Sequence, residues 1–372
     1  MKKIFVIIFV TVLVLFSVFN IIKPDVEFSE NENRYLAKMP EFSFQSLLDG
    51  SFNENFEKYI TDQIAFRDFF VFVKSNSEKL IGKSENNNVY FCDDGYLIDV
   101  PPKFNESIVN NNIKGINALS ETGKYNVCLS LIPTAYEILK DKLPENAYKD
   151  IQQKVLNYVK NNLVDVNYTD STETLRKYKD EYIYYRTDHH QTMNGSFYVY
   201  QDIIKNLDKN PYEKEDFTIT EVANDFYGTT WSKSQVNTEP DKIIKYEPLF
   251  DISYTTEYVD KNEKYNSLYK EENLKIKDKY TYYLGGNNSI VNIKTSIKNG
   301  EKLAVIKDSY AHSIIPFLAN HYEEIMVVDL RYFSYNLDEF LTERNIKDVL
   351  FIYNVTNFIN DNNLIKISAY LK

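Results

Sequence analysis

Two short motifs, far apart in the chain, carry the side chains that could do chemistry. The first runs from Tyr185 to Thr192 (YRTDHHQT), and the second runs from Val305 to His312 (VIKDSYAH). The chain has only 4 histidines, and two of them are neighbours in the first motif. A serine hydroxyl becomes a nucleophile when an imidazole removes its proton and a carboxylate orients that imidazole. The two motifs together therefore predict an enzyme with a serine nucleophile.

Ser309 follows an apolar run that predicts a strand, and the residues after it predict the start of a helix. In open α/β sheets, functional sites lie at the carboxyl ends of strands. We therefore expect Ser309 on a strand-to-helix turn, where the amides and the positive dipole end of the helix face an oxyanion. The backbone N–H of Tyr310 is the expected oxyanion donor. Asn287, in a Gly-Gly-Asn turn, is a second candidate.

The histidines are the candidate bases for this serine: His189, His190, His312 and His321. At the end of a strand, alternation places Asp188 and His190 on one side and His189 on the other. One face then carries a carboxylate and an imidazole. We expect Asp188 to orient His190, and His190 to activate Ser309. Arg186 and His189 are further candidates for contacts with the substrate.

These motifs could also serve two different roles. An Asp308-Ser309 pair after a strand is equally typical of plain helix N-capping. An Asp-His-His cluster could instead hold a metal ion, with His312 as a further ligand. The sequence shows no second Asp, Glu or His cluster with ligand spacing, so we expect neither a metal nor a cofactor.

Composition narrows the class of protein. The 372 residues carry a net charge of −11, which argues against nucleic acid and against anionic lipid headgroups as the main partner. A hydrophobic content of 43% and a charged content of 26% are typical of a globular protein. Cys92 and Cys128 are the only cysteines. A disulfide between them is one possibility. A buried free thiol at Cys128, which lies in an apolar run, is the other.

The N-terminus predicts a membrane anchor. An apolar run from Ile4 to Ile22 follows two lysines. Its length of about 19 residues nearly spans a bilayer and exceeds the apolar region of a signal peptide. We expect residues 1–23 to form an uncleaved signal anchor, with a cleaved signal peptide as the alternative. Lys2 and Lys3 favour a cytoplasmic N-terminus, so the rest of this single-pass chain would lie outside the cytoplasm.

Strands that alternate with helices predict an α/β layered domain with a mainly parallel sheet. Strands are expected near 87–98 (a hairpin), 127–132, 164–166, 182–185, 303–306, 325–328 and 349–352. Helices are expected as a pair between 52 and 80 with a break at 63–68, and at 104–122, 148–162, 194–207 and from 313. Residues 24–50 would form a membrane-proximal segment and 51–372 the extracytoplasmic domain, with a β-rich insertion at about 210–285.

The first motif resembles the signature of the bacterial DHHW family, which is similar to the SGNH-hydrolase-like alginate O-acetyltransferases of exopolysaccharide secretion. Those proteins carry an Asp-x-His-Trp motif well before a Gly-Asp-Ser-Phe-type nucleophile motif. The counterparts here are Asp188, His190 and Ser309, while Gln191 stands in place of Trp and Lys307 in place of Gly. The stretches ENRYL (32–36) and DQIAFR (62–67) also fit the family.

The resemblance implies an SGNH-hydrolase-like three-layer domain and an acyl-enzyme formed on the serine. It also implies an extracytoplasmic O-acetyltransferase that acts on a cell-surface or secreted polysaccharide, with a multi-pass membrane acyltransferase as the acyl donor. Two alternatives stay open. One is a polysaccharide acetylesterase with the same triad, and the other is a non-catalytic scaffold or binding subunit of an envelope polysaccharide machine.

Overall fold

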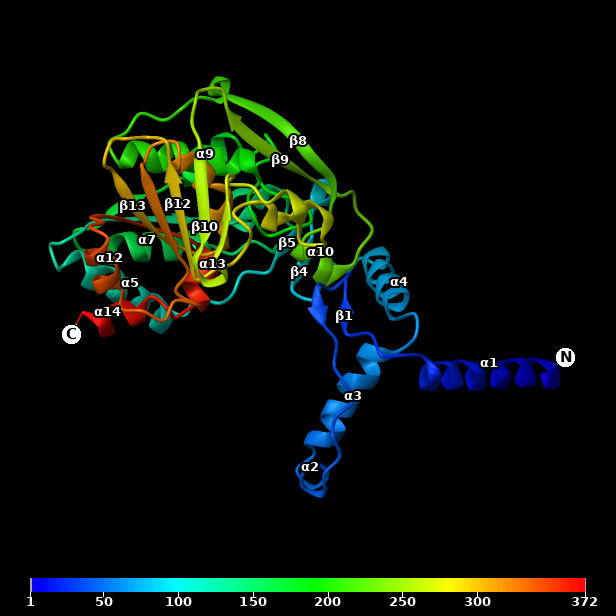
Figure 1. The fold of residues 1–372 in the computed structure, drawn as a ribbon. Helices are drawn as coiled ribbons and strands as arrows, with labels where there is room; N and C mark the ends of the chain where they lie inside the picture. Colours follow the sequence, from blue (N-terminus) through cyan, green and yellow to red (C-terminus); the bar gives the residue numbers. More distant parts are fainter. Residues whose placement is uncertain (1, 372) are drawn as a thin grey trace. The chain divides into compact units, whose positions relative to one another are not determined.

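A computed structural model describes residues 2–371 of the chain (Figure 1). It divides into two compact units. The first contains the residues up to Asn87 together with Trp231–Thr238, and the second contains Asn88–Thr230 and the residues from Glu239 on. Residues 51–87 belong to the first unit, where the Gln63 side chain hydrogen-bonds to the backbone of Val26.

The first unit is mainly helical. Its N-terminal helix α1 is the one described helix that is long and apolar enough to cross a membrane, with a mean hydropathy of 2.9. The expected break at 63–68 is confirmed, since α3 ends at Gln63 and α4 begins at Arg67. The elements of this unit are α1 (Lys2–Ile22), β1 (Phe28–Ser29), β2 (Arg34–Tyr35), α2 (Phe44–Leu48), α3 (Ser51–Gln63), α4 (Arg67–Leu80) and β3 (Glu85–Asn86).

A mixed sheet of 8 strands organises the second unit, in the order β11-β10-β12-β14-β13-β15-β6-β7. Strands β14, β13, β15, β6 and β7 pair in parallel, whereas β12, β10 and β11 extend one edge in antiparallel pairs. The sheet is therefore parallel only in the part that leads to Ser309. Its strands are β6 (Asn126–Ile132), β7 (Asn167–Thr169), β10 (Tyr254–Tyr258), β11 (Glu263–Tyr265), β12 (Ile290–Thr295), β13 (Lys302–Lys307), β14 (Glu324–Val328) and β15 (Asp348–Asn354).

Both faces of this sheet are buried, which explains the continuous apolar runs of its parallel strands. Along β13, Leu303 and Val305 belong to one apolar cluster and Ala304 and Ile306 to the other. Helix α9 (Met193–Asn206) covers the first face (Figure 1). The opposite face is covered by α5 (Glu106–Ser120), α7 (Ile151–Asn162), α12 (Leu337–Glu343), α13 (Val355–Asn360) and α14 (Ile365–Tyr370).

The remaining elements are short. The expected hairpin is formed by β4 (Val89–Phe91) and β5 (Leu97–Asp99). A separate two-stranded sheet contains β8 (Phe217–Phe226) and β9 (Asp241–Pro248). Short helices are α6 (Ala135–Ile138), α8 (Thr172–Lys177), α10 (Thr229–Ser234) and α11 (Ile315–Leu318). Cys92 is half-buried, Cys128 is buried, and both are free thiols.

Three expectations about the elements need correction. The insertion at 210–285 is not a wholly separate lobe, because β10 and β11 join the main sheet. Residues 182–185 form no strand and make only an isolated bridge between Tyr184 and Gln191. The chain after Ser309 forms a 3-10 turn (Ser309–Ser313) and then the single turn of α11, so no long helix points its dipole at the serine.

Candidate active site

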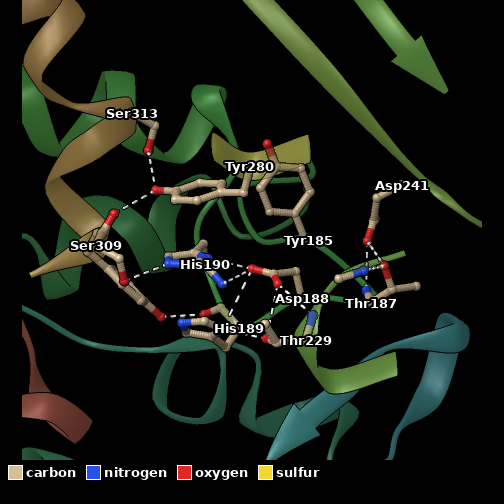
Figure 2. Close-up of polar contacts among 12 residues, drawn as sticks. Tyr185, Thr187, Asp188, His189, His190, Thr229, Asp241, Tyr280, Ser309 and Ser313 are labelled. Carbon is tan, nitrogen blue, oxygen red and sulfur yellow. Dashed lines mark hydrogen bonds and ion pairs between the residues drawn. The ribbon is translucent and has the colours of Figure 1, made fainter. Parts of the chain in front are cut away.

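The structure brings Asp188, His190 and Ser309 together (Figure 2). His190 Nδ1 lies 2.6 Å from Asp188 Oδ1, and His190 Nε2 lies 2.8 Å from Ser309 Oγ. Asp188 and His190 are buried, whereas Ser309 is only half-buried. In this geometry the imidazole can take the serine proton while the carboxylate holds its tautomer.

The charges of the pair suit a general base. Burial opposes ionisation of Asp188, but the adjacent rings of His190 and His189 hold the pKa of this carboxyl well below its usual range. Burial and, after it, the electrostatic effect of the neighbouring His189 ring lower the pKa of His190 to about 4, against the pull of Asp188. At neutral pH the site therefore contains a carboxylate and a neutral imidazole, the form that accepts a proton.

The carboxylate of Asp308 fixes the turn that carries Ser309. Its Oδ1 accepts the N–H of Tyr310 at 2.9 Å, and its Oδ2 accepts the backbone and side-chain N–H groups of Asn354 and the side chain of Asn357. Because Asn354 ends the neighbouring strand β15, Asp308 ties the serine turn to the sheet. Asp308 thus caps the same turn on which Ser309 lies. The Tyr310 N–H, the expected oxyanion donor, is bonded to Asp308 in this conformation.

Asp241, at the start of β9, holds the turn that carries the histidines. One carboxylate oxygen accepts the Arg186 N–H at 2.9 Å, and the other accepts the Thr187 N–H at 2.7 Å and the Thr187 hydroxyl at 2.6 Å. Asp241 is buried, so these bonds are shielded from water (Figure 2). The turn is thereby fixed at the residue before Asp188.

Thr229 and Gly228 complete the support of the Asp188 carboxylate. Asp188 Oδ2 accepts the Thr229 N–H at 2.8 Å and the Thr229 hydroxyl at 3.0 Å. A Cβ atom on Gly228 would lie 2.2 Å from the Cβ of Asp188, so a side chain there would displace the carboxylate. The backbone of this segment approaches Asp188 as closely as only glycine permits.

Tyr280 covers the imidazole. Its ring stacks on that of His190 with centroids 3.7 Å apart and an interplanar angle of 8°. Its hydroxyl donates to the carbonyl oxygen of Ser309 at 3.0 Å and lies 3.1 Å from Ser313 Oγ. Ser313 in turn contacts Ser196, which accepts from the Gln191 side chain at 2.9 Å. Gln191, at the position where the family usually has Trp, therefore ends a buried network that reaches the backbone carbonyl of Ser309.

A buried ion pair involves Lys307, the last residue of β13 and two residues before Ser309. Lys307 is 2% exposed, and its Nζ lies 2.8 Å from Asp329 Oδ2 and 2.9 Å from His312 Nε2. Burial lowers the pKa of Lys307, while the charge of Asp329 opposes this shift. Arg331 binds Asp329 through two nitrogens at 2.9 and 2.6 Å. The lysine that stands in place of the family glycine is thus paired and satisfied.

The other predicted residues lie at different distances from the centre. His189 was expected to point away, but its ring centroid is 3.8 Å from that of His190, because this segment is a turn rather than a strand. Its Nδ1 lies 2.6 Å from Thr229 Oγ1. The Arg186 guanidinium lies over the rings of Tyr96 and Tyr182, and exposed Asn287 accepts from Arg331. Among the described residues, neither Arg186 nor Asn287 hydrogen-bonds to Ser309.

A metal ion is the alternative use of this cluster. Ligand atoms of Asp188, His189 and His190 lie within 4.8 Å of one another. The same atoms, however, are engaged in hydrogen bonds with each other, with Thr229 and with Ser309, and a metal would have to replace them. His312, considered as a further ligand, accepts instead from Lys307.

Three supporting residues were not predicted: Thr229, Asp241 and Tyr280. All lie within the region taken as an insertion, and no motif surrounds them in the sequence. Gly228, the only glycine between Gly195 and Gly285 in the sequence, is the one local signal for a close backbone approach.

Fold and site together define a class, the α/β proteins in which a serine at the end of a parallel strand meets an Asp-His pair from another part of the chain. The profile of the DHHW family, described as DHHW protein, matches residues 86–328, and the chain belongs to this family.

The chain also resembles solved structures. A DHHW family protein from Eubacterium siraeum is 26% identical with a TM-score of 0.65, over 76% of this chain and 96% of that chain. Bacillus cereus PatB1 with a sulfonyl adduct is 23% identical with a TM-score of 0.64, over 75% and 98% of the two chains. The O-acetyltransferase domain of Pseudomonas putida AlgJ is more distant, at 11% identity and a TM-score of 0.48 over 76% and 99%. No curated protein matches the chain.

Proposed function

We propose that this protein is a membrane-anchored, extracytoplasmic O-acetyltransferase. It would move an acetyl group through an acyl-enzyme on Ser309 onto a hydroxyl of a cell-surface or secreted polysaccharide. The observation that carries the proposal is the imidazole of His190, which is bonded to Asp188 at one nitrogen and to the serine hydroxyl at the other. The resemblance of the two motifs to the O-acetyltransferase signature supplies the class of reaction.

The proposed reaction has two steps that use the same groups. First, His190 Nε2 takes the proton of Ser309 as Oγ bonds to the acyl carbon, and the donor's leaving group departs with that proton. Second, a sugar hydroxyl gives its proton to His190 and attacks the acyl carbon, and Ser309 Oγ leaves and recovers the proton. Asp188 stays ionised throughout and stabilises the transient imidazolium.

The developing oxyanion needs donors other than the Tyr310 amide. Ser309 stands at the first position of its 3-10 turn, where an N–H has no partner within the turn. We propose this amide as one donor. This donor is the backbone N–H of Ser309 itself, the residue whose hydroxyl would attack the acyl group.

The proposed location rests on α1. Its 21 residues are long enough to cross a bilayer, and its side chains are not buried in the protein. Lys2 and Lys3 precede the apolar run, which favours a cytoplasmic N-terminus and an extracytoplasmic second unit. A polysaccharide acceptor and a multi-pass membrane acyl donor are partners that fit this location.

Acyl transfer to Ser309 is directly testable. Full-length protein in detergent is incubated with p-nitrophenyl acetate, and peptides are examined by mass spectrometry. We expect an acetyl adduct on the peptide that contains Ser309, none in Ser309→Ala, and an unchanged adduct in Ser253→Ala, which alters an exposed serine. No adduct in the unaltered protein, together with unchanged polymer acetylation in cells that carry Ser309→Ala, would contradict the proposal and leave a scaffold or binding role.

The acceptor decides between a transferase and an esterase, because water can attack the same acyl-enzyme. An oligosaccharide is added to the acylated protein, and the products are analysed. An acetylated sugar supports the transferase, and free acetate alone supports the esterase.

A further inference from the structure

One side of α4 exposes a row of large apolar side chains. They share one face because they follow one another at helical spacing. We call this row the apolar stripe, and it consists of Phe66, Phe69, Phe70 and Val73, which are 65%, 61%, 47% and 42% exposed. A contiguous apolar surface of this kind marks an interaction site.

The face of α4 opposite the stripe is covered, since Ser75 is buried and accepts from the Asn86 side chain at 2.9 Å. Phe72, beside the stripe, is a further exposed apolar side chain, at 40%. The stripe ends at Asn76, which accepts from the backbone of Asn237 at 2.9 Å. The charged residues flank the stripe or lie opposite it: Arg67, Asp68, Lys74, Glu78 and Lys79. The helix is thus amphipathic, and these bonds hold its apolar face outward.

The stripe begins against the membrane-side helix. The ring of Phe66 stacks on Phe19 of α1, with centroids 6.0 Å apart and an angle of 14°. The ring of Phe70 meets Phe16 edge-on, with centroids 6.4 Å apart. At 1.5 Å of rise per residue, Phe16 lies about 9 Å before the end of α1 at Ile22. The first turn of α4 therefore contacts a part of α1 that would lie inside the apolar layer of a bilayer.

Two stretches whose sequences resemble the family hold this junction together. They are the ENRYL and DQIAFR stretches. Arg34 binds both carboxylate oxygens of Asp62, at 2.6 and 2.8 Å, and Glu32 forms an ion pair with Arg67. The side chain of Gln63 bonds to the backbone of the segment that follows α1. These contacts fix the start of α4 relative to the end of α1.

Two further features lie at the corner between α3 and α4. The Ala65 N–H donates to Asn20 Oδ1 of α1 at 2.7 Å. Phe66 has a φ of 60°, a left-handed conformation that is unfavourable for a bulky side chain. This conformation is found where the Phe66 ring stacks on α1, so backbone strain accompanies the contact with the membrane-side helix.

We propose that α4 is an interfacial helix whose apolar stripe inserts into the outer lipid leaflet beside α1. The occupant is lipid because the stripe continues the apolar surface of a helix whose own side chains face lipid. The proposal rests on the membrane anchor of the proposed function. It is also consistent with the acidic net charge, since an apolar contact needs no anionic headgroups.

Depth-dependent fluorescence quenching tests this contact. Full-length protein with Cys92→Ser and Cys128→Ala is placed alone in phosphatidylcholine vesicles. Phe69→Cys and Val73→Cys carry an environment-sensitive fluorophore, and vesicles with doxyl groups on the acyl chains quench it. We expect a loss of fluorescence at both positions that is similar to the loss at Val10→Cys within α1. Lys298→Cys, at an exposed lysine of the second unit, should show no loss.

Each other result has a defined meaning. Quenching of the α4 labels by aqueous iodide rather than by doxyl lipids places the stripe in water and overturns the proposal. Labels that neither agent quenches indicate a protein contact, such as a second copy, and also overturn it. If the Val10 label is not quenched either, the membrane anchor itself fails. Acetylation of Ser309 in the same samples shows that the variants are folded.

Discussion

The carboxylate of Asp188 offers the sharpest test of the proposed chemistry. It accepts four hydrogen bonds, from the backbone and Nδ1 of His190 and from the backbone and hydroxyl of Thr229. Asp188→Asn keeps the shape but replaces one acceptor oxygen with an NH2 donor. If that NH2 faces His190, Nδ1 must accept, and the ring proton moves to Nε2, where it faces Ser309. The imidazole can then no longer take the serine proton.

The size of the effect follows from the tautomer. Loss of the correct tautomer in a Ser-His-Asp triad lowers the rate by about 10⁴, which corresponds to about 5.5 kcal/mol in the barrier. If the NH2 instead faces Thr229, a buried donor meets two donors, which costs about 1–3 kcal/mol of stability. Thr229→Val is the matched comparison. It removes only the hydroxyl and keeps the backbone donor, so we expect a loss of about tenfold in rate, or about 1.4 kcal/mol.

The assay is the initial burst of p-nitrophenol from p-nitrophenyl acetate, measured by stopped flow together with thermal unfolding. The expected order of acylation rates is unaltered protein, then Thr229→Val, then Asp188→Asn far below both. An Asp188→Asn protein that is as stable as the unaltered protein, and therefore has its NH2 toward His190, yet acylates within tenfold of it would refute the assignment of Asp188 as the residue that orients His190.

Other perturbations have equally definite outcomes. Gly228→Ala should abolish acylation while α/β circular dichroism is retained, because the new Cβ would lie 2.2 Å from the Cβ of Asp188; an active variant would contradict this close approach. Because burial lowers the pKa of His190 to about 4, acylation should be constant from about pH 8 to about pH 5 and fall below about pH 4. A midpoint near pH 6.5 in the rate profile would contradict a neutral His190 at pH 5. The same shift should reduce stability as the pH falls from 6.5 to about 4, since the unfolded chain takes up the proton first; urea unfolding at several pH values measures this. Tyr280→Phe keeps the stacked ring but loses the bond to the Ser309 carbonyl, so the unfolding free energy should fall by about 1 kcal/mol, and a loss well above 3 kcal/mol would show a larger role for the hydroxyl.

Much of the sheet could be predicted because its central strands are buried on both faces. The runs around Val127, Val305, Val327 and Leu350 are continuously apolar, and each became a parallel strand. The antiparallel edge was missed because β10, rich in Tyr and Thr, is only partly buried and has no such run. A sheet edge is less constrained by burial than its centre, so its pattern carries less information.

The sequence predicted the three side chains that the structure brings together in the candidate site, but not the residues that support them. Asp188, His190 and Ser309 have side chains whose chemistry is restrictive, and they lie in motifs. Asp241 and Tyr280 act through ordinary hydrogen bonding and stacking, which many residues of the chain could supply, so only the tertiary structure selects them. The misplaced His189 has a similar cause, because strand alternation was applied to a segment that Asp241 folds into a turn.

The buried Lys307 constrains how this protein can be altered. Lys307→Gly would restore the usual family residue, yet it would leave Asp329 with Arg331 alone and His312 without its donor. Removing one partner of a buried ion pair costs about 3–5 kcal/mol. Positions 307, 312 and 329 therefore form an epistatic set. A relative with glycine at the first of them is expected to differ at the other two, and grafts between family members should exchange all three together.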